Sequence, residues 1–234
     1  VLGLYIGIII LLNIPYVQRQ MSMFVAKELS AILNSQLNIG RINIGLLNRI
    51  IIDDLILNDQ SGKELLKIGR LSAKFEILPL FNGRISIGNV QLFSFNANLE
   101  RATPQEKTNF QFILDAFASK DTLKENNNLN LRINSLLIRR GKVSYNVLSA
   151  KQTPGKFNPQ HIRLSNILAN ISLKALQNDS INAAIKRMSV EEEHSGFELK
   201  KLSLKIVANN QRMRIENFTI DLPNTSLAMD TIRM

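Results

Sequence analysis

The chain of 234 residues contains no cysteine, no tryptophan and only two histidines, His161 and His194. Without cysteine it forms neither disulfides nor thiolate metal sites. The histidines are far apart and have no other ligand at metal-binding spacing, which argues against a zinc site. The chain also lacks a glycine-rich phosphate loop and a G-x-S-x-G nucleophile motif. We therefore expect a protein that is not an enzyme, with no catalytic residue, no metal and no cofactor.

The excess of positive charge does not resemble a nucleic-acid site. The chain carries 29 Lys and Arg against 19 Asp and Glu, a formal net charge of +10. These cations are scattered, with only isolated pairs such as Arg139-Arg140 and Lys200-Lys201, and no aromatic residues interleave with them. We expect solvated strand faces with some attraction to anionic lipid head groups, and no nucleic-acid partner.

The first 17 residues are almost wholly apolar. A spanning helix needs about 20 predominantly apolar residues, and we predict a transmembrane signal anchor over residues 1–17. A cleaved signal peptide fits less well because no small-residue cleavage site follows Leu12. A buried core helix is the other alternative. The anchor residues that we predict to face lipid are Leu2, Ile6, Ile9, Ile10 and Leu11.

Residues 18–38 are predicted to form an amphipathic helix, because apolar residues recur there at helical spacing. The predicted apolar face consists of Val17, Met21, Phe24, Val25, Leu29, Ile32 and Leu33. Such a helix can lie on a membrane surface. Alternatively, it covers the first edge of the β structure that follows and keeps that edge from pairing with other chains. The two interpretations are compatible.

From residue 39 to residue 234 one pattern recurs: an aliphatic residue, a two-residue step, and then two aliphatic residues with period 2. The three best copies begin at Ile87, Ile133 and Ile215, and looser copies include Ile52/Leu55/Leu57 and Leu164/Ile167/Ala169. The period of 2 indicates half-buried strands. The two-residue step shifts the alternation by one residue, as a β-bulge does. The pattern therefore predicts a mainly β domain, a long curled antiparallel sheet with one inserted helix near Phe110–Phe117.

A sheet with one apolar face has to bury that face. A second layer can fill it, or the sheet can curl into an open groove that is wide enough for lipid, and the sequence alone does not separate the two. If the groove is open, we expect its lining to include the aliphatic and phenylalanine residues of the repeat. The candidate lipid-binding residues are Ile85, Ile87, Val90, Leu92, Phe93, Phe95, Leu136, Ile138, Leu202 and Leu204.

The order of these segments resembles the AsmA-like superfamily, and within it the TamB proteins of the Bacteroidetes type. Three passages carry the resemblance beyond the apolar start of the chain. They are Phe24–Asn58, which contains the hydrophobic–D–D–L–x–L strand Ile51–Leu57; Leu65–Arg84, with its L…I–x–x–L–x–A–x–F spacing; and the helix Phe110–Phe117. The motifs are hydrophobic spacings rather than invariant chemistry, and they cover about the first half of the chain.

The resemblance implies a single-pass inner-membrane protein with its bulk in the periplasm of a Gram-negative bacterium. Its β-taco groove would carry phospholipid in outer-membrane biogenesis. An outer-membrane BamA/TamA-like partner would be met through a part of the chain that is not present here. Because both ends of the sequence look cut, we expect an amino-terminal fragment of a longer protein. The alternatives are a scaffold for the assembly of outer-membrane β-barrels and a structural β-repeat protein without lipid cargo.

Overall fold

The computed structural model describes residues 2–45, 48–75, 87–118, 134–177, 180–209 and 211–233. Its helices are α1 (Leu2–Leu12), α2 (Pro15–Leu33) and α4 (Gln111–Ala118). Its strands are β1 (Leu37–Gly45), β2 (Arg49–Asn58), β3 (Glu64–Phe75), β4 (Ile87–Arg101), β5 (Ser135–Val147), β6 (His161–Gln177), β7 (Ser180–Glu192), β8 (Phe197–Ala208), β9 (Met213–Asp221) and β10 (Ser226–Arg233). The described part of the chain is therefore mainly β, as the sequence predicts.

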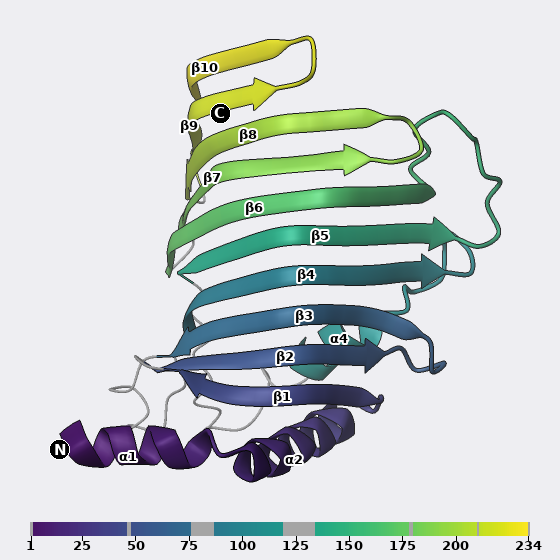
Figure 1. Ribbon diagram of the computed structural model, residues 1–234. Helices are drawn as coiled ribbons and strands as arrows, with labels where there is room; N and C mark the ends of the chain where they lie inside the picture. The colour runs from purple at the N-terminus through teal and green to yellow at the C-terminus, as the bar shows by residue number, and fades with distance from the viewer. Residues whose placement is uncertain are drawn as a thin grey trace.

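The ten strands form one open sheet in chain order, from β1 at one edge to β10 at the other (Figure 1). Every neighbouring pair is antiparallel except β4 and β5, which are parallel. The prediction of a purely antiparallel sheet was wrong at this point. Parallel neighbours need a long crossover connection, and the segment that contains α4 supplies it by returning the chain to the starting end of β4.

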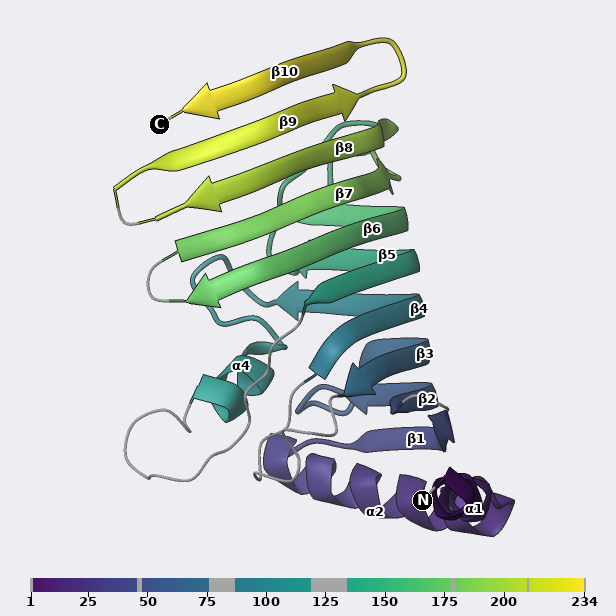
Figure 2. The same ribbon diagram turned by 90° about the vertical axis from the view of Figure 1, so that its left-hand side faces the viewer.

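The sheet is bent rather than flat. The strands run across the view of Figure 1 and turn away at one edge, and Figure 2 shows the arms that lie beyond this turn. Helix α2 lies against β1, and α4 lies inside the bend near the β1 end. The helices therefore cover only the first part of the sheet, and the β10 end has no helix over it among the described residues.

Helix α2 begins at Pro15, whose fixed φ suits the first turn of a helix, and it ends where Asn34 takes up a left-handed conformation with φ of 47°. The predicted helix over residues 18–38 therefore begins earlier and ends earlier in the structure, and β1 takes the residues from Leu37 onward. Its buried line runs through Gln18, Ser22 and Leu33, while Phe24 of the predicted apolar face is 64% exposed. Compared with the prediction, the helix is rotated about its axis, because the buried amide of Gln18, rather than an aliphatic side chain, holds its first turns against β1.

Helix α1 is apolar along its length and projects past the bent edge of the sheet (Figure 1). Within the described ranges, no helix by itself combines the length and the hydrophobicity needed to cross a bilayer. The two helical segments Ile6–Leu12 and Pro15–Leu33, joined at a bend of 71°, reach that threshold only as a pair.

Candidate functional site

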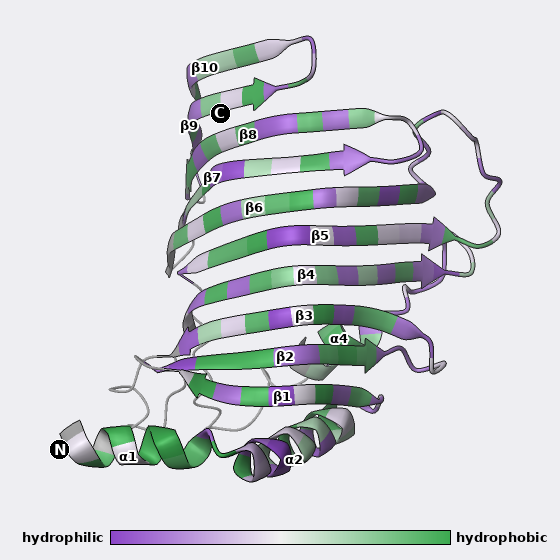
Figure 3. Cartoon of the chain, in the orientation of Figure 1, coloured by the Kyte–Doolittle hydropathy of each residue, from purple (hydrophilic) through white to green (hydrophobic). Residues whose placement is uncertain are grey.

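The strongest candidate for a functional site is the inner face of the bent sheet, which we call the apolar face. Residues that pair directly across neighbouring strands point to the same side of a sheet. The register pairs apolar residues with apolar residues from β1 to β10. One row follows Ile42, Ile52, Leu71, Leu92, Ile138 and Ala169. A second follows Met188, Leu202, Ile220 and Leu227. In the colours of Figure 3, the hydrophobic residues alternate with polar ones along these strands.

The bend is made by strand residues with left-handed backbone. Non-glycine residues with positive φ are uncommon, yet they occur inside five strands: Asp54, Ser94, Arg140, Asn166 and Asn217, with φ between 52° and 56°. Three of them, Arg140, Asn166 and Asn217, coincide with shifts of register. A left-handed bulge residue kinks its strand and moves the side-chain alternation by one. Three of these residues lie on the neighbouring strands β4, β5 and β6, with Asp54 on β2 and Asn217 on β9, so their kinks contribute to one bend across the sheet.

The repeat predicted some of these kinks and misplaced others. The two-residue steps before Leu55, Ile167 and Phe218 contain the left-handed residues Asp54, Asn166 and Asn217, as predicted. In the copies that begin at Ile87 and Ile133, however, the left-handed residues are Ser94 and Arg140, which lie several residues further along. The apolar side chains before each kink therefore keep their alternation longer than the sequence suggests.

Most of the predicted lining residues lie on the apolar face. These are Val90, Leu92, Phe95, Leu136, Ile138, Leu202 and Leu204, and all of them are half-buried. Ile85 and the side chain of Ile87 lie outside what the structure describes.

The structure corrects the placement of Phe93. It pairs with Arg70 on one side and with Arg139 on the other, on the polar outer face of the sheet. The guanidinium of Arg139 lies 6.0 Å from the centre of its ring, a cation–π distance. The kink at Ser94 separates Phe93 from Phe95, so the two phenylalanines point to opposite sides.

The β1 end of the apolar face is filled. Its buried core consists of Leu33, Leu37, Leu55, Leu57, Leu65 and Ile68. The α4 residues Phe112, Ile113 and Ala116 pack against this core, with Leu92 and Leu99 of β4. Helix α2 thus covers the edge strand β1, as the edge-covering interpretation of that helix predicts. Each fully buried leucine contributes about 1.5–3 kcal/mol, so this end is the stable foundation of the sheet.

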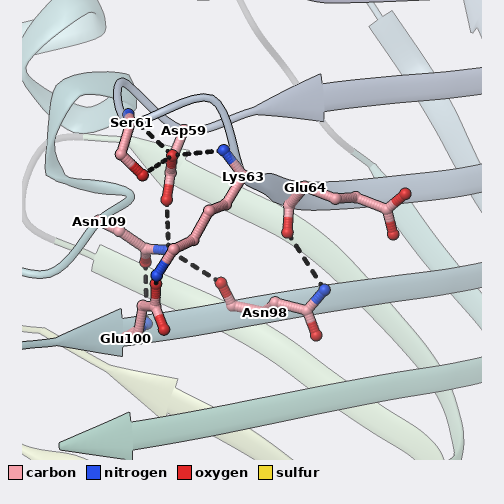
Figure 4. A network of polar contacts seen from close by, with 7 residues as sticks. All are labelled: Asp59, Ser61, Lys63, Glu64, Asn98, Glu100 and Asn109. Carbon is pink, nitrogen blue, oxygen red and sulfur yellow. Dashed lines mark hydrogen bonds and ion pairs between the residues drawn. The ribbon is translucent and has the colours of Figure 1, made fainter. Parts of the chain in front are cut away.

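A polar network holds α4 in place (Figure 4). The amide Nδ2 of Asn109 donates to the backbone carbonyl of Asn98 at 3.0 Å, and its Oδ1 accepts from the backbone N–H of Glu100 at 2.9 Å. Lys63 and Glu100 form an ion pair at 2.7 Å. The network fastens the segment before α4 to the hairpin between β2 and β3.

Asp59 is the buried acid of this network, with 5% of its surface exposed. Burial alone would raise its pKa, but hydrogen bonds from the Ser61 hydroxyl, the Lys63 and Ser61 backbone N–H groups and the Asn109 amide hold the pKa of this carboxyl below its usual range. A hollow of about 760 Å³ lies beside it, lined on one side by Phe112 of α4. The carboxylate joins the turn between β2 and β3 to Asn109 through these four hydrogen bonds.

The apolar face becomes progressively more exposed toward β10. In the middle of the sheet a smaller core forms around Ile167, Val190 and Leu199. At the far edge, Leu227 is 44% exposed and Met229 is 41% exposed. No described helix or loop packs over these two side chains. The inner face is therefore a packed core at one end and an exposed apolar surface at the other.

Phe95 marks the boundary between the two ends, because it packs against both cores. Its ring lies over Gly141 of β5. A Cβ on that glycine would sit only 2.2 Å from Cε1 of the ring, far inside van der Waals contact. The glycine therefore makes the room in which this ring spans the apolar face.

The polar residues near the β7–β8 turn are structural as well. Glu192 is 2% exposed, and it accepts hydrogen bonds from the Ser195 hydroxyl and from the backbone N–H groups of Ser195, His194 and Arg163. Burial opposes ionisation, but these hydrogen bonds outweigh it and lower the pKa of Glu192 to about 2. The carboxylate closes a turn.

A similar structural role falls to His161, which is buried between the Asn146 side chain and the Ala150 carbonyl at 3.2 and 3.0 Å. Among the residues that the structure describes, no group of His, Asp or Glu is arranged to hold a metal ion. Glu192 and His161 are thus held by neighbouring groups, whereas the buried Nε of Arg101 and Nδ1 of His194 have no hydrogen-bond partner among the described residues.

An amide cluster sets the elbow between α1 and α2. Asn13 donates from Nδ2 to the carbonyls of Ile9 and Ile44, both at 2.8 Å. Gln18 donates from Nε2 to Oδ1 of Asn13 at 3.1 Å and to Oδ1 of Asn43 at 2.6 Å. These contacts join both helices to β1. They fix the direction of α1, which would otherwise depend on a flexible two-residue break.

The predicted anchor residues belong to α1. Ile6 is 45% exposed, Ile10 64% and Leu11 57%, while Ile9 is half-buried and the side chain of Leu2 lies outside what the structure describes. Comparison with protein-family models and with curated proteins found no match for the chain.

Proposed function

We propose that this chain is the anchored start of a lipid conduit of the AsmA-like kind, in the envelope of a Gram-negative bacterium. Helix α1 would hold it at the inner membrane. The apolar face would carry the acyl chains of phospholipids through the periplasm, with the head groups in water. Such transfer needs no catalytic residue, because the cargo is bound by burial alone.

The observation that carries this proposal is that the apolar face extends further across the sheet than the helices that cover it. The face continues to β10, but the helices that the structure describes pack on it only near β1. Exposed contiguous apolar surface of this kind marks an interaction site in a folded protein. On β8 and β9, where no described helix covers the face, Leu202, Leu204 and Ile220 are only half-buried.

The energetics suit acyl chains. Each buried CH₂ group contributes about 0.8 kcal/mol. An acyl chain of a dozen or more carbons that lies on the apolar face therefore regains most of the free energy of burial that it loses on leaving a bilayer. Aliphatic side chains from several strands offer many equivalent contacts. A lipid can therefore move along the face without a deep energy minimum.

Helix α1 supports the membrane location. A helix of a water-soluble protein buries one side, but α1 exposes large apolar residues widely, with Leu4 73% and Ile10 64% exposed. It carries no charged residue. A bilayer is the environment that removes such a surface from water.

The test uses a photoreactive amino acid at neighbouring positions of β8. Leu204 lies on the apolar face, whereas Ser203 lies on the polar face and pairs with Thr219. Irradiation of cells should give a phospholipid adduct from position 204 and none from position 203. Equal labelling from both positions, or labelling from 203 alone, would exclude a lipid path on this face.

A second candidate is a scaffold for outer-membrane β-barrel assembly, which adds client strands to a free sheet edge. The open sheet favours it, because its ten described strands follow one another in chain order and do not close on themselves. Leu227→Glu separates the two functions. If the chain is a conduit, the new charge blocks lipid adducts at position 204 while the protein stays folded. If the chain is a scaffold, the assembly of outer-membrane barrels continues, because backbone groups make the contact with the client strand.

A further inference from the structure

The outer side of the bend carries a furrow that is separate from the apolar face. Three adjoining hollows of about 620, 410 and 340 Å³ form it. The first and second share Gly40 and Arg41, and the second and third share Asp53, Gly69 and Arg70. The furrow therefore runs without a break from the α1–α2 elbow to Arg140 of β5.

Glycines keep the floor of the furrow low. Gly40 of β1 and Gly69 of β3 lie on either side of the left-handed residue Asp54. A Cβ on Gly40 would lie 2.9 Å from Cβ of Asp54, and one on Gly69 would lie 3.3 Å from Cβ of Ser94. Side chains are thus missing where the strands kink, and backbone forms the bottom of the hollow.

Arginines line the furrow. The register sets Arg41, Asp53, Arg70, Phe93 and Arg139 directly opposite one another across β1 to β5. At about 4.8 Å for each strand step, this row is about 19 Å long. With Arg19 at the elbow and Arg140 at the far end, four arginines line the three hollows against the aspartates Asp53 and Asp54. The excess charge is positive.

The furrow and the anchor form one hydrogen-bonded unit. The amide cluster at the elbow ends on Asn43, whose Nδ2 donates to Oδ2 of Asp53 at 3.4 Å. Arg70 donates from Nε to the other oxygen of Asp53 at 2.6 Å. The chain of contacts thus runs from Asn13 beside α1 to Arg70 on the third strand. The direction in which α1 leaves the sheet is tied to the orientation of the arginine row.

We infer that this furrow docks on the surface of an anionic phospholipid bilayer, with its arginines on the lipid phosphates. The inference rests on the proposed anchoring by α1. Guanidinium groups bind phosphate oxygens in pairs of parallel hydrogen bonds. The furrow starts at the elbow from which the exposed apolar helix projects past the bend (Figure 1). This continuity favours a lipid surface over an acidic protein. Docking holds the bent edge of the sheet against the membrane and leaves the apolar face turned away from it.

The chain has no cysteine, so a single introduced cysteine carries a unique label. Ser94→Cys places a fluorophore in the furrow, at the middle of β4, and Gln160→Cys places one in the loop between β5 and β6, beyond the ends of those strands. The full chain is reconstituted in vesicles of phosphatidylethanolamine and phosphatidylglycerol that contain a lipid with a nitroxide on its head group. We expect quenching at position 94, little at position 160, and loss of quenching in phosphatidylcholine vesicles.

The charge variant is Arg19→Gln/Arg41→Gln/Arg140→Gln, which leaves the pair of Arg70 and Asp53 intact. Each basic residue near an anionic surface strengthens binding about fivefold, so the docked-to-undocked ratio should fall about 100-fold. The charge-matched control, Lys107→Gln/Lys151→Gln/Lys156→Gln, should keep the quenching, and far-UV circular dichroism checks that both variants fold.

The outcomes separate this inference from the proposed function. If the chain does not float with vesicles of either composition, the anchor itself fails. If it floats but the label at position 94 is not quenched, or if both charge variants behave alike, the furrow does not dock on lipid. Crosslinking of position 94 to an acidic protein in cells, without quenching in vesicles, would also overturn the inference.

Discussion

The contact between Phe95 and Gly141 gives a quantitative test of the bent sheet. The Cβ of Gly141→Ala would lie 2.2 Å from Cε1 and 2.9 Å from Cδ1 and Cζ of the Phe95 ring. Carbon atoms prefer a separation of about 3.5–4.0 Å, so the ring has to move by more than an ångström. Because Phe95 packs against both cores, that movement disturbs both. Overpacking of this kind costs about 1–3 kcal/mol.

The assay is thermal unfolding of the reconstituted or detergent-solubilised full chain. A loss of 1 kcal/mol lowers the Tm by about 2–4 °C for a protein of this size. Gly88→Ala is the matched control, because a Cβ there meets nothing closer than 3.7 Å, and we expect its Tm to be unchanged or slightly raised.

A double-mutant cycle with Phe95 tests whether the ring causes this cost. Phe95→Leu alone should destabilise the chain, but Phe95→Leu/Gly141→Ala should be more stable than the sum of the two single effects, with a coupling of about 1 kcal/mol or more. If Gly141→Ala matches the control, or if the two changes are additive, the ring does not lie over this glycine and the described packing of the middle of the sheet is incorrect.

Three further predictions concern the polar residues. The pKa of Glu192 is lowered from 4.5 to about 2, so the ionised carboxylate stabilises the fold fully above pH 4.5 and this stabilisation is lost as the pH falls through 2. Urea unfolding should therefore show that the free energy of unfolding falls, between these pH values, by about 3 kcal/mol more in the natural chain than in Glu192→Gln. Asn109→Ala should cost about 1–3 kcal/mol and speed amide hydrogen exchange in α4. At the left-handed Asn217, replacement by Gly should be nearly neutral in urea unfolding, whereas replacement by Val should cost about 1–2 kcal/mol, and equal effects would argue against the kink.

The sequence predicts the kinks only where a polar pair interrupts the apolar pattern. At Asp54, Asn166 and Asn217 the change of phase is visible, because aliphatic residues stand on both sides of a polar step. At Ser94 it is hidden, because Phe93 and Phe95 look like successive members of one alternating series. Phe93 is tolerated on the outer face since Arg139 stacks on it, and a contact across strands leaves no mark on the local pattern.

The parallel pairing of β4 with β5 was equally hidden, since side chains alternate with the same period in parallel and antiparallel strands. The arginine row was missed for a related reason. Arg41, Arg70 and Arg139 are far apart in the chain, and they come together only through the register of five strands. Scanning for clusters along the sequence finds none of them.

The sequence by itself determined that the chain is mainly β, that its strands have one apolar and one polar side, and that its first helix is apolar all round. These are local properties, because the side-chain period follows from the backbone within a few residues. Only the tertiary structure decided which strands are neighbours, where the kinks align into one bend, and which part of the apolar face the helices cover. Those depend on contacts between residues far apart in the chain, and a local period contains no information about its partner.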